Sequence, residues 1–284
     1  MIRVNPCPSV VLFFVAGLIH VRWVYFAFLM ISCLQAEPSW KPELTSPLPG
    51  SFPKPAPTSL TFQVSWNGTL NAGIVRIEFA PPDVAKAGSY IIRSSAASKG
   101  TAALLFPYQT NFWSELATTS LRPHFFHAVE TDHRETVTTA VRHFPTRVES
   151  RKITKPLKTG VSKPTDHVFE WSPVFDLFSA MLHVRSQKLA TGDKITLVIH
   201  PFDTPYLLRV KVIGREVHQG RNTIRLTVGL RKINRKTSEL IAYKKLKQDA
   251  TLWLSDDADR IPVELRAAAF IGDVRVSLTS LKKL

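Results

Sequence analysis

LTFQVSWNGTLNAGIVRIEF, residues 60–79, decides the fold class. Apolar residues alternate with polar ones in two runs, from Leu60 to Trp66 and from Val75 to Phe79. Alternation with a period of two is typical of β-strands that bury one face. Between the runs, Asn67-Gly68 is a residue pair that tolerates positive φ and favours a tight hairpin turn. The stretch therefore predicts two antiparallel strands joined by a turn.

The same period of two recurs along the rest of the chain, with Pro, Gly, Asn and Asp between the runs. Further strands are predicted at 90–96, 110–116, 123–131, 135–144, 146–153, 194–202, 206–217, 222–230, 249–255, 261–270 and 273–281. TAALLF, residues 101–106, is a candidate for a short helix. The strand spacing is that of an antiparallel meander, so the sequence predicts a mostly β protein.

One segment, WSPVFDLFSAMLHVRSQ, breaks this pattern and predicts a helix over 173–187. Ser172 is the predicted N-cap, a proline follows it, and Asp176 is a favourable charge in the first turn. Apolar residues at helical spacing form a broad face, which is expected to cover the concave face of the sheet. Leu177 belongs to that face, so replacing it with Asp is expected to unfold the domain.

The first 36 residues have the parts of a secretory signal: an early Arg3, a short apolar run and small residues ending at Ala36. MISC, ending at Cys33, approximates the cleavage box of bacterial lipoproteins. Three alternatives stay open: cleavage near Ala36, lipidation of Cys33, or an uncleaved membrane anchor. Each of them predicts an exported protein, placed in the periplasm and in two cases anchored to a membrane.

Residues 37–58, EPSWKPELTSPLPGSFPKPAPT, hold seven prolines. Such a stretch favours extended backbone and cannot donate regular hydrogen bonds. We interpret it as a semi-rigid linker that precedes a β-rich domain at 59–284.

The chain carries a formal net charge of +15, from 37 Lys and Arg against 22 Asp and Glu. This excess favours polyanions, but the basic residues are spread along the chain and no nucleic-acid partner is expected. Cys7 and Cys33 are the two cysteines, so the predicted domain can form no disulfide and no cysteine-ligated metal site.

Candidate chemical sites are few. Asp256, Asp257 and Asp259 lie between two predicted strands, where aspartates favour a tight turn, and no calcium-loop spacing follows them. His124 and His127 are separated by an odd number of residues and would point to opposite faces of a strand. No nucleophile elbow or phosphate loop is present. We therefore assign no catalytic residue, metal or cofactor, and expect the protein not to be an enzyme.

Two basic runs flank one predicted hairpin and could form a patch for anionic lipid head groups. They comprise Arg231, Lys232, Arg235, Lys236, Lys244, Lys245 and Lys247. The alternative is a solvated hairpin tip that resists edge aggregation.

Several segments, in this order, resemble a bacterial envelope family known as domain of unknown function 3108. They are LTFQVSWNGTLNAGIVRIEF, FPYQTNFWSEL, DLFSAMLHVRS, TGDKITLVIHPFDTPYLLRVKVIGREV and TLWLSDDADRIPVEL, and the resemblance covers about residues 59–284. It implies an exported protein of Gram-negative bacteria with a fold similar to that of lipoprotein carriers. The expected fold is a single curved antiparallel sheet, a half-barrel or open barrel, covered by one or two helices. No catalytic residues are known for the family.

The leading hypothesis is a non-catalytic envelope protein that binds an apolar ligand such as a lipid or an acylated peptide. The predicted lining residues are Phe175, Phe178, Met181 and Leu182 on the helix and Phe62, Trp66, Phe112 and Trp253 on the sheet. The alternative is a purely structural role, in which all eight side chains fill the core. A second hypothesis is a protein-interaction or scaffold module in envelope assembly, without a ligand cavity and with an unidentified protein partner.

Overall fold

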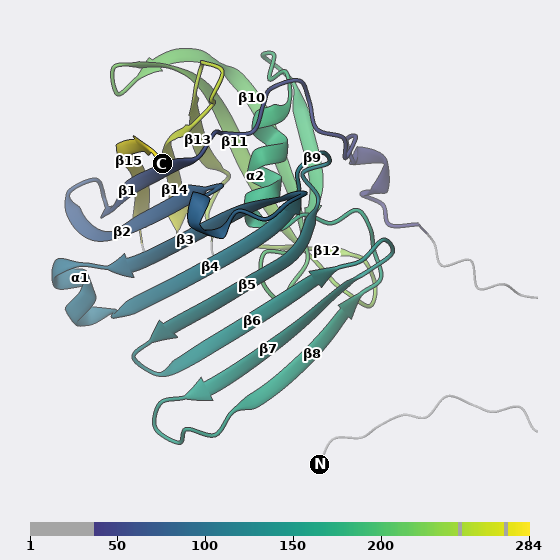
Figure 1. The fold of residues 1–284 in the computed structure, drawn as a ribbon, viewed down its shortest axis with the longest axis vertical. Coiled ribbons are helices and arrows are strands. Elements are labelled where there is room, and N and C mark those ends of the chain that lie inside the picture. The colour runs from purple at the N-terminus through teal and green to yellow at the C-terminus, as the bar shows by residue number, and fades with distance from the viewer. Residues whose placement is uncertain (1–36, 244–245, 270–271) are drawn as a thin grey trace, which may run out of the picture. The chain divides into compact units, whose positions relative to one another are not determined.

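One antiparallel sheet contains most of the chain that the computed structural model describes, which comprises residues 37–243, 246–269 and 272–284 (Figure 1). Its fifteen strands within these ranges are β1 Thr58–Trp66, β2 Leu70–Phe79, β3 Ser89–Ser98, β4 Tyr108–Ala117, β5 Pro123–Asp132, β6 Glu135–His143, β7 Val148–Pro156, β8 Lys163–Phe169, β9 Lys194–Ile199, β10 Tyr206–His218, β11 Arg221–Ile233, β12 Leu240–Ala242, β13 Ala250–Ser255, β14 Pro262–Ala269 and β15 Gly272–Lys283. The pairing order is β8-β7-β6-β5-β4-β3-β2-β1-β15-β14-β13-β11-β10-β9, with β12 beside β11.

The β1–β2 hairpin forms as its sequence predicts. Asn67 and Gly68 have φ angles of 51° and 73°, the left-handed conformations that a tight hairpin turn requires. Within β1, Leu60 and Phe62 are buried on one face, whereas the intervening Thr61 is not. The alternation of apolar and polar residues therefore predicts correctly which face of the strand packs against the core.

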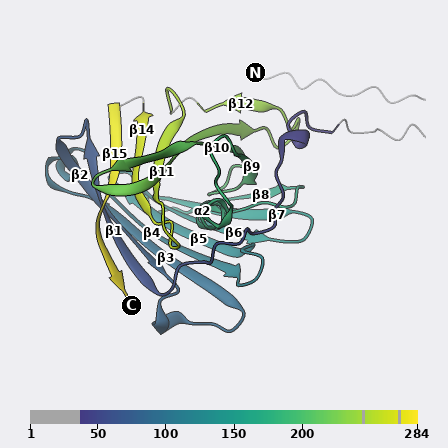
Figure 2. The ribbon, with the colours of Figure 1, turned by 90° about the horizontal axis from the view of Figure 1, so that it is seen from above.

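The sheet curves around a helix and stays open. Its first and last strands along the chain are neighbours, since β1 pairs antiparallel with β15 from Thr58↔Lys283 to Trp66↔Val274. Figure 2 shows α2, Leu177–Ser186, inside this curve. The edge strands β8 and β9 are not paired with each other. The predicted single curved antiparallel sheet, an open barrel, is confirmed.

Helix α2 begins four residues later than predicted. Asp176, not Ser172, is the N-cap: its carboxylate accepts from the Ser179 backbone N–H at 2.7 Å, and the Ser179 hydroxyl accepts from the Asp176 N–H at 2.8 Å. This reciprocal pair is a capping box. The preceding Phe175 is extended, because its N–H donates to the Val198 carbonyl of β9 and its carbonyl accepts from the N–H of His200, just beyond that strand.

The predicted burial of Leu177 is wrong. This side chain is 44% exposed, whereas Phe178 and Leu182 are 3% and 0% exposed. The segment is apolar on several sides, so its sequence does not single out one buried face. The expectation that Leu177→Asp unfolds the domain is withdrawn.

The predicted short helix is present as α1, Gly100–Leu105, in the connection from β3 to β4. None of its residues is buried, and it does not cover the sheet. The helix that occupies the concave side is α2.

The proline-rich stretch packs against the domain, in contrast to the linker that its composition suggests. We call residues 38–57 the strap. Trp40 is 1% exposed, contacts the Trp171 ring at a centroid distance of 4.8 Å, and donates from Nε1 to the Ser238 carbonyl at 2.7 Å. The Thr45 N–H donates to Thr196 on β9 at 3.0 Å. Pro38–Leu284 accordingly forms one compact unit, which begins well before residue 59.

Further along, the strap covers the C-terminal end of α2. Gly50 fits closely there, since a Cβ on it would lie 2.1 Å from the Ser186 carbonyl oxygen. The Phe52 N–H donates to the same carbonyl at 3.1 Å, and its ring lies 3.2 Å below the Arg260 guanidinium. Finally, the Pro55 carbonyl accepts from the buried Tyr90 hydroxyl at 2.5 Å.

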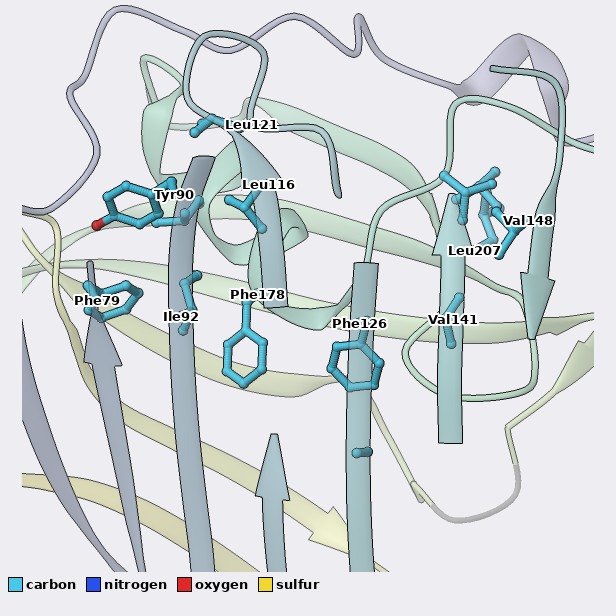
Figure 3. Close-up of a cluster of buried hydrophobic side chains, with 14 of the residues drawn as sticks. Phe79, Tyr90, Ile92, Leu116, Leu121, Phe126, Val141, Val148, Phe178 and Leu207 are labelled. Atoms are coloured by element: carbon cyan, nitrogen blue, oxygen red, sulfur yellow. The ribbon is translucent and has the colours of Figure 1, made fainter. Parts of the chain in front are cut away.

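Buried side chains form two clusters, one on each side of α2. The first contains Phe178 and Leu182 together with residues of β1 to β8, including Phe79, Ile92 and Phe126 (Figure 3). The second contains Ala180 and Val184 of α2 with aliphatic residues of β9, β10, β11 and β13.

The predictions for the first 36 residues, including lipidation of Cys33, lie outside the described residues. Within the described ranges, no helix has both the length and the apolar character needed to cross a membrane.

Candidate apolar ligand site

A cavity of about 480 Å³ lies between α2 and the strands β1, β2, β10, β11, β13, β14 and β15. The helix contributes Leu177, Phe178, Ala180, Met181 and Val184 to its wall. Among the described residues that line the cavity none is charged, and the hydroxyl of Tyr243 is the one polar side-chain group. The site therefore favours hydrocarbon over any polar ligand group.

The alternation of the strands makes the opposite wall apolar. β2 contributes Val75 and Ile77, two residues apart, and β14 contributes Leu265 and Ala267 in the same way. Val75, Ile77 and Leu265 are half-buried, unlike Phe79 at the end of β2, which is 2% exposed. Inward-facing apolar side chains along this arc are thus accessible to a ligand.

Three of the eight predicted lining residues do line the cavity: Phe62, Phe178 and Met181. Phe175 and Leu182 do not line it, and both are buried in the clusters beside α2, at 1% and 0% exposure. The structure therefore supports the core-filling alternative for these two.

Phe112 and Trp66 also lie outside the cavity wall. The Phe112 ring packs 6.1 Å from Phe126 and 6.2 Å from Phe178, within the first cluster. Trp66 ends β1 beyond a register irregularity, and a Cβ on Gly272 would lie 2.4 Å from its Nε1. The irregularity changes the direction of the side chains at the end of the strand. The alternation between inward and outward faces therefore does not continue to Trp66.

Trp253 lies on the face of the sheet opposite the cavity. Its neighbours Leu252 and Leu254 line the cavity, and a shift of one residue reverses the face of a strand. The Trp253 ring stacks on His218 with 4.1 Å between centroids, and its Nε1 donates to Glu216 at 2.6 Å. The prediction that Trp253 lines the apolar site is wrong.

Trp253 instead borders a polar depression of about 420 Å³ on the outer face. The nearby Glu264 is 2% exposed, accepts from Ser277 at 3.0 Å and also contacts Arg266 and Gln219. Its carboxylate is thus neutralised and fully hydrogen-bonded, as a structural ion pair is.

Several lining residues were missed, notably Leu208, Val210, Val228 and Leu230 on β10 and β11. Their alternation is visible in the sequence. What it does not reveal is that β10 and β11 face the same helix as β1 and β2, because that depends on how far the sheet curves.

The aspartate stretch is a turn, as predicted, and it also fixes α2. Asp257 accepts from the Asp259 and Arg260 N–H groups at 3.0 and 2.9 Å. The Arg185 guanidinium donates to the Asp259 carbonyl at 2.5 and 3.0 Å, while Arg260 donates to the Arg185 carbonyl at 3.0 Å. These bonds hold the C-terminal end of the helix against the β13–β14 connection.

At the other end of α2, burial raises the pKa of the Asp176 carboxyl. Hydrogen bonds from Ser114, at 2.5 Å, and from Ser179 oppose that change. The cap therefore fixes the helix to β4 and holds the cavity-lining residues that follow it.

The predicted basic hairpin is partly present. β11 and β12 form a hairpin on which Arg231, Lys232 and Lys236 are exposed, and Lys247 is exposed beyond it. Arg235 is half-buried, and burial lowers its pKa. It therefore does not belong to the exposed patch. Lys244 and Lys245 lie outside the described residues.

The described part of the chain contains no group of three or more His, Cys, Asp or Glu side chains placed to hold a metal ion.

Comparison with one solved structure supports this architecture. A structure of a β-barrel-like protein of domain of unknown function DUF1849 from Brucella abortus has a TM-score of 0.51 and 10% identity, covering 81% of this chain and 99% of that one. A protein assigned as exported, with a YmcC-like fold, from Bacteroides fragilis has a TM-score of 0.32 and 6% identity, covering 83% and 100%. A protein assigned as a lipoprotein from Parabacteroides distasonis has a TM-score of 0.31 and 6% identity, covering 83% and 99%.

No curated protein matches the chain. The model of the family described as protein of unknown function (DUF3108) matches residues 61–279, which confirms the resemblance seen in the sequence. The chain belongs to this family.

Proposed function

We propose that this chain is a non-catalytic protein of the cell envelope that binds an apolar ligand, such as the acyl chain of a lipid or of an acylated peptide. The ligand lies in the cavity between α2 and the arc from β2 through β1 and β15 to β10. The observation that carries this proposal is the uncharged, apolar lining of that cavity.

The dimensions and chemistry of the cavity suit an acyl chain. Its volume of about 480 Å³ falls in the range of about 300–1,000 Å³ that is typical of small-molecule sites. Each methylene transferred from water contributes about 0.8 kcal/mol. A charged head group would find no partner inside, so we place it at the opening beside Leu177, which is 44% exposed.

The scaffold hypothesis is less well supported, because neither sheet edge suits an added strand. β8 carries Pro164 and Asp166, residue types that discourage pairing at an edge. β9 is covered by hydrogen bonds from Thr45 of the strap and from Phe175.

Export is part of the proposal and rests on the sequence of the first 36 residues. The exposed cations Arg231 and Lys232 follow Leu230 directly, and Leu230 lines the cavity. An anionic head group that leaves the cavity on the β11 side, as an alternative to the opening beside Leu177, would be near these charges.

The experiment is native mass spectrometry of the full chain, followed by displacement of a fluorescent fatty acid by saturated fatty acids of increasing length. We expect co-purified lipid, and an affinity that rises about fourfold per methylene until the cavity is filled. Consistent absence of bound lipid together with no affinity for the probe would overturn the proposal.

Two neighbouring alanines of β14 provide a matched pair of variants. Ala267 lines the cavity, whereas Ala268 faces the outer depression. Ala267→Phe is expected to reduce probe affinity at least about tenfold by occupying ligand space, and Ala268→Phe to leave it unchanged. Equal losses in both variants would show that the probe binds elsewhere.

A further inference from the structure

The α1 tip, residues 99–108 with the sequence KGTAALLFPY, presents large apolar side chains to solvent. Leu104, Leu105 and Phe106 are 83%, 67% and 66% exposed, and no residue of α1 is buried. Three consecutive side chains of this kind form a patch that soluble surfaces avoid unless it contacts a partner or a membrane. The helix therefore does not serve the core of the domain.

A second tip of similar composition joins β7 to β8. Leu157 and Val161 are 54% and 63% exposed there. Lys155, Lys158 and Lys163 are exposed around them, and no acidic residue occurs from 150 to 165.

The two tips lie on the same side of the sheet, where the ends of neighbouring strands meet (Figure 1). By this edge we mean that row of strand ends and not the edge strands β8 and β9. The α1 tip joins β3 to β4, and the other joins β7 to β8, so four strand spacings, about 19 Å, separate them. The β5–β6 turn lies between them, where the Arg134 carbonyl accepts from the Leu157 N–H at 2.8 Å.

We propose that this edge docks on an anionic lipid bilayer, with the α1 tip inserted at the boundary between head groups and acyl chains. Apolar side chains flanked by lysines match the chemistry of that interface, where leucine and phenylalanine enter and cations remain at the phosphates. Each lysine near such a surface strengthens binding about fivefold. The proposal does not depend on ligand binding in the cavity.

Charge favours a membrane over a second copy of the chain as the occupant. Lys99 lies at the α1 tip, and Lys155, Lys158 and Lys163 lie at the other. Neither tip segment, 99–108 or 150–165, contains an acidic residue. Two copies meeting through these tips would bring like charges together, whereas anionic lipid neutralises them.

The test is hydrogen exchange of the full chain, measured by mass spectrometry with vesicles of phosphatidylglycerol and phosphatidylcholine and with phosphatidylcholine alone. Peptide-level readout separates docking of the edge from membrane attachment through residues 1–36. We expect exchange in 99–108 to slow at least about threefold on the anionic vesicles, less on neutral ones, and not at all without lipid.

The α1 variant is the triple replacement of Leu104, Leu105 and Phe106 by Ser, and the matched control is Val217→Ser. Val217 is 72% exposed on the β10–β11 hairpin, away from this edge. We expect the triple variant to lose the protection of 99–108 and the control to retain it. Unchanged exchange in 99–108 while the chain sediments with anionic vesicles would overturn the proposal. A lipid-independent dimer that the triple variant abolishes would assign the tips to self-association and overturn it too.

Discussion

The two sides of α2 are both apolar, yet one is packed and the other borders a cavity. On the packed side, Leu182 is fully buried in a cluster in which the rings of Phe112, Phe126 and Phe202 lie 6.0–6.1 Å apart. Phe178 lies at the boundary, since it belongs to this cluster and also lines the cavity. On the cavity side, the helix faces half-buried aliphatic residues and small ones such as Ala267.

Side-chain volume explains this difference. Phe202 comes from the β9–β10 connection and packs its ring against Phe112 of β4 and Phe126 of β5. The loop is fixed there by an ion pair of 3.6 Å between Lys152 and Asp203. On the cavity side, the β12–β13 connection contributes Tyr243 and Leu246 to the wall, and the strands there carry mostly aliphatic residues in place of packed rings. Hydrophobic patterning alone thus predicts which face of an element is apolar. The volume of the side chains on that face decides whether the enclosed space is a filled core or a cavity.

The largest expected effect on stability comes from adjacent truncations of α2. Leu182→Ala should lower the free energy of unfolding by about 2–5 kcal/mol, because Leu182 is fully buried on the packed side. Met181→Ala should cost about 1 kcal/mol, because that side chain lines the cavity and is only half-buried. Urea denaturation measures both. Equal losses would mean that the two sides of the helix are packed alike.

A pH dependence should come from buried histidines near the packed side. Burial lowers the pKa of His200 from 6.5 to about 4 and that of His143 to about 3, with nearby cationic groups adding to the effect. The folded state keeps these rings neutral while the unfolded state takes up protons below 6.5, so stability falls as pH drops from about 6.5 to about 4. His200, 1% exposed, would contribute about 3 kcal/mol.

Melting temperatures across that range provide the measurement, with His143→Leu as the comparison. Both ring nitrogens of His143 are buried without a hydrogen-bond partner among the described residues. The variant should therefore show a flatter dependence on pH. A profile as steep as that of the unaltered protein would exclude His143 as a contributor.

Leu177→Asp should separate binding from folding. Leu177 is 44% exposed at the cavity opening, so water can hydrate the introduced charge. The free energy of unfolding should therefore change by less than about 1 kcal/mol. Acyl-probe affinity should fall at least about tenfold, because the charge meets the entering hydrocarbon. Leu48→Asp is the control, since Leu48 is 69% exposed on the strap. Unfolding of the Leu177 variant would restore the original prediction of a buried face.

The smallest effect on stability is expected at the basic hairpin. Reversing the charges of Arg231, Lys232, Lys244 and Lys245 should change the free energy of unfolding by at most about 0.5 kcal/mol. Binding to anionic vesicles should weaken by about two to three decades if these cations contact head groups, and the effect should fade with salt. If the charge-reversed variant binds anionic vesicles as the unaltered protein does, and salt has no effect, the hairpin serves solubility only. Vesicle binding would then be assigned to the α1 tip.

The sequence predicts thirteen of the fifteen described strands, because alternation and the Asn67-Gly68 turn act locally, but it misses β8 and the short β12. It places the start of α2 wrongly, because Phe175 is drawn into hydrogen bonds with β9, a partner that local propensity cannot indicate. The strap shows the same limit. Its prolines predict extended backbone, but the burial of Trp40 depends on Trp171 and Ser238, which are distant in the chain.

For the site, three of the eight predicted lining residues line the cavity and five do not. Phe62, Phe178 and Met181 follow from strand and helix periodicity. Trp253 illustrates the failure, because Leu252 and Leu254 on either side of it face the cavity and alternation places Trp253 on the opposite face. The curvature that brings β10 and β11 opposite β1 and β2 is a property of the whole sheet.

The central claim is that the cavity beside α2 holds a hydrocarbon chain. The direct measurement is covalent labelling of the folded full chain by a photoreactive fatty acid, with the modified residues identified by mass spectrometry. We predict labels on Met181, Leu252 and Leu265, suppressed by excess unlabelled fatty acid and by Ala267→Phe. Labels confined to the outer face around Trp253, or no suppressible labelling at all, would contradict the claim.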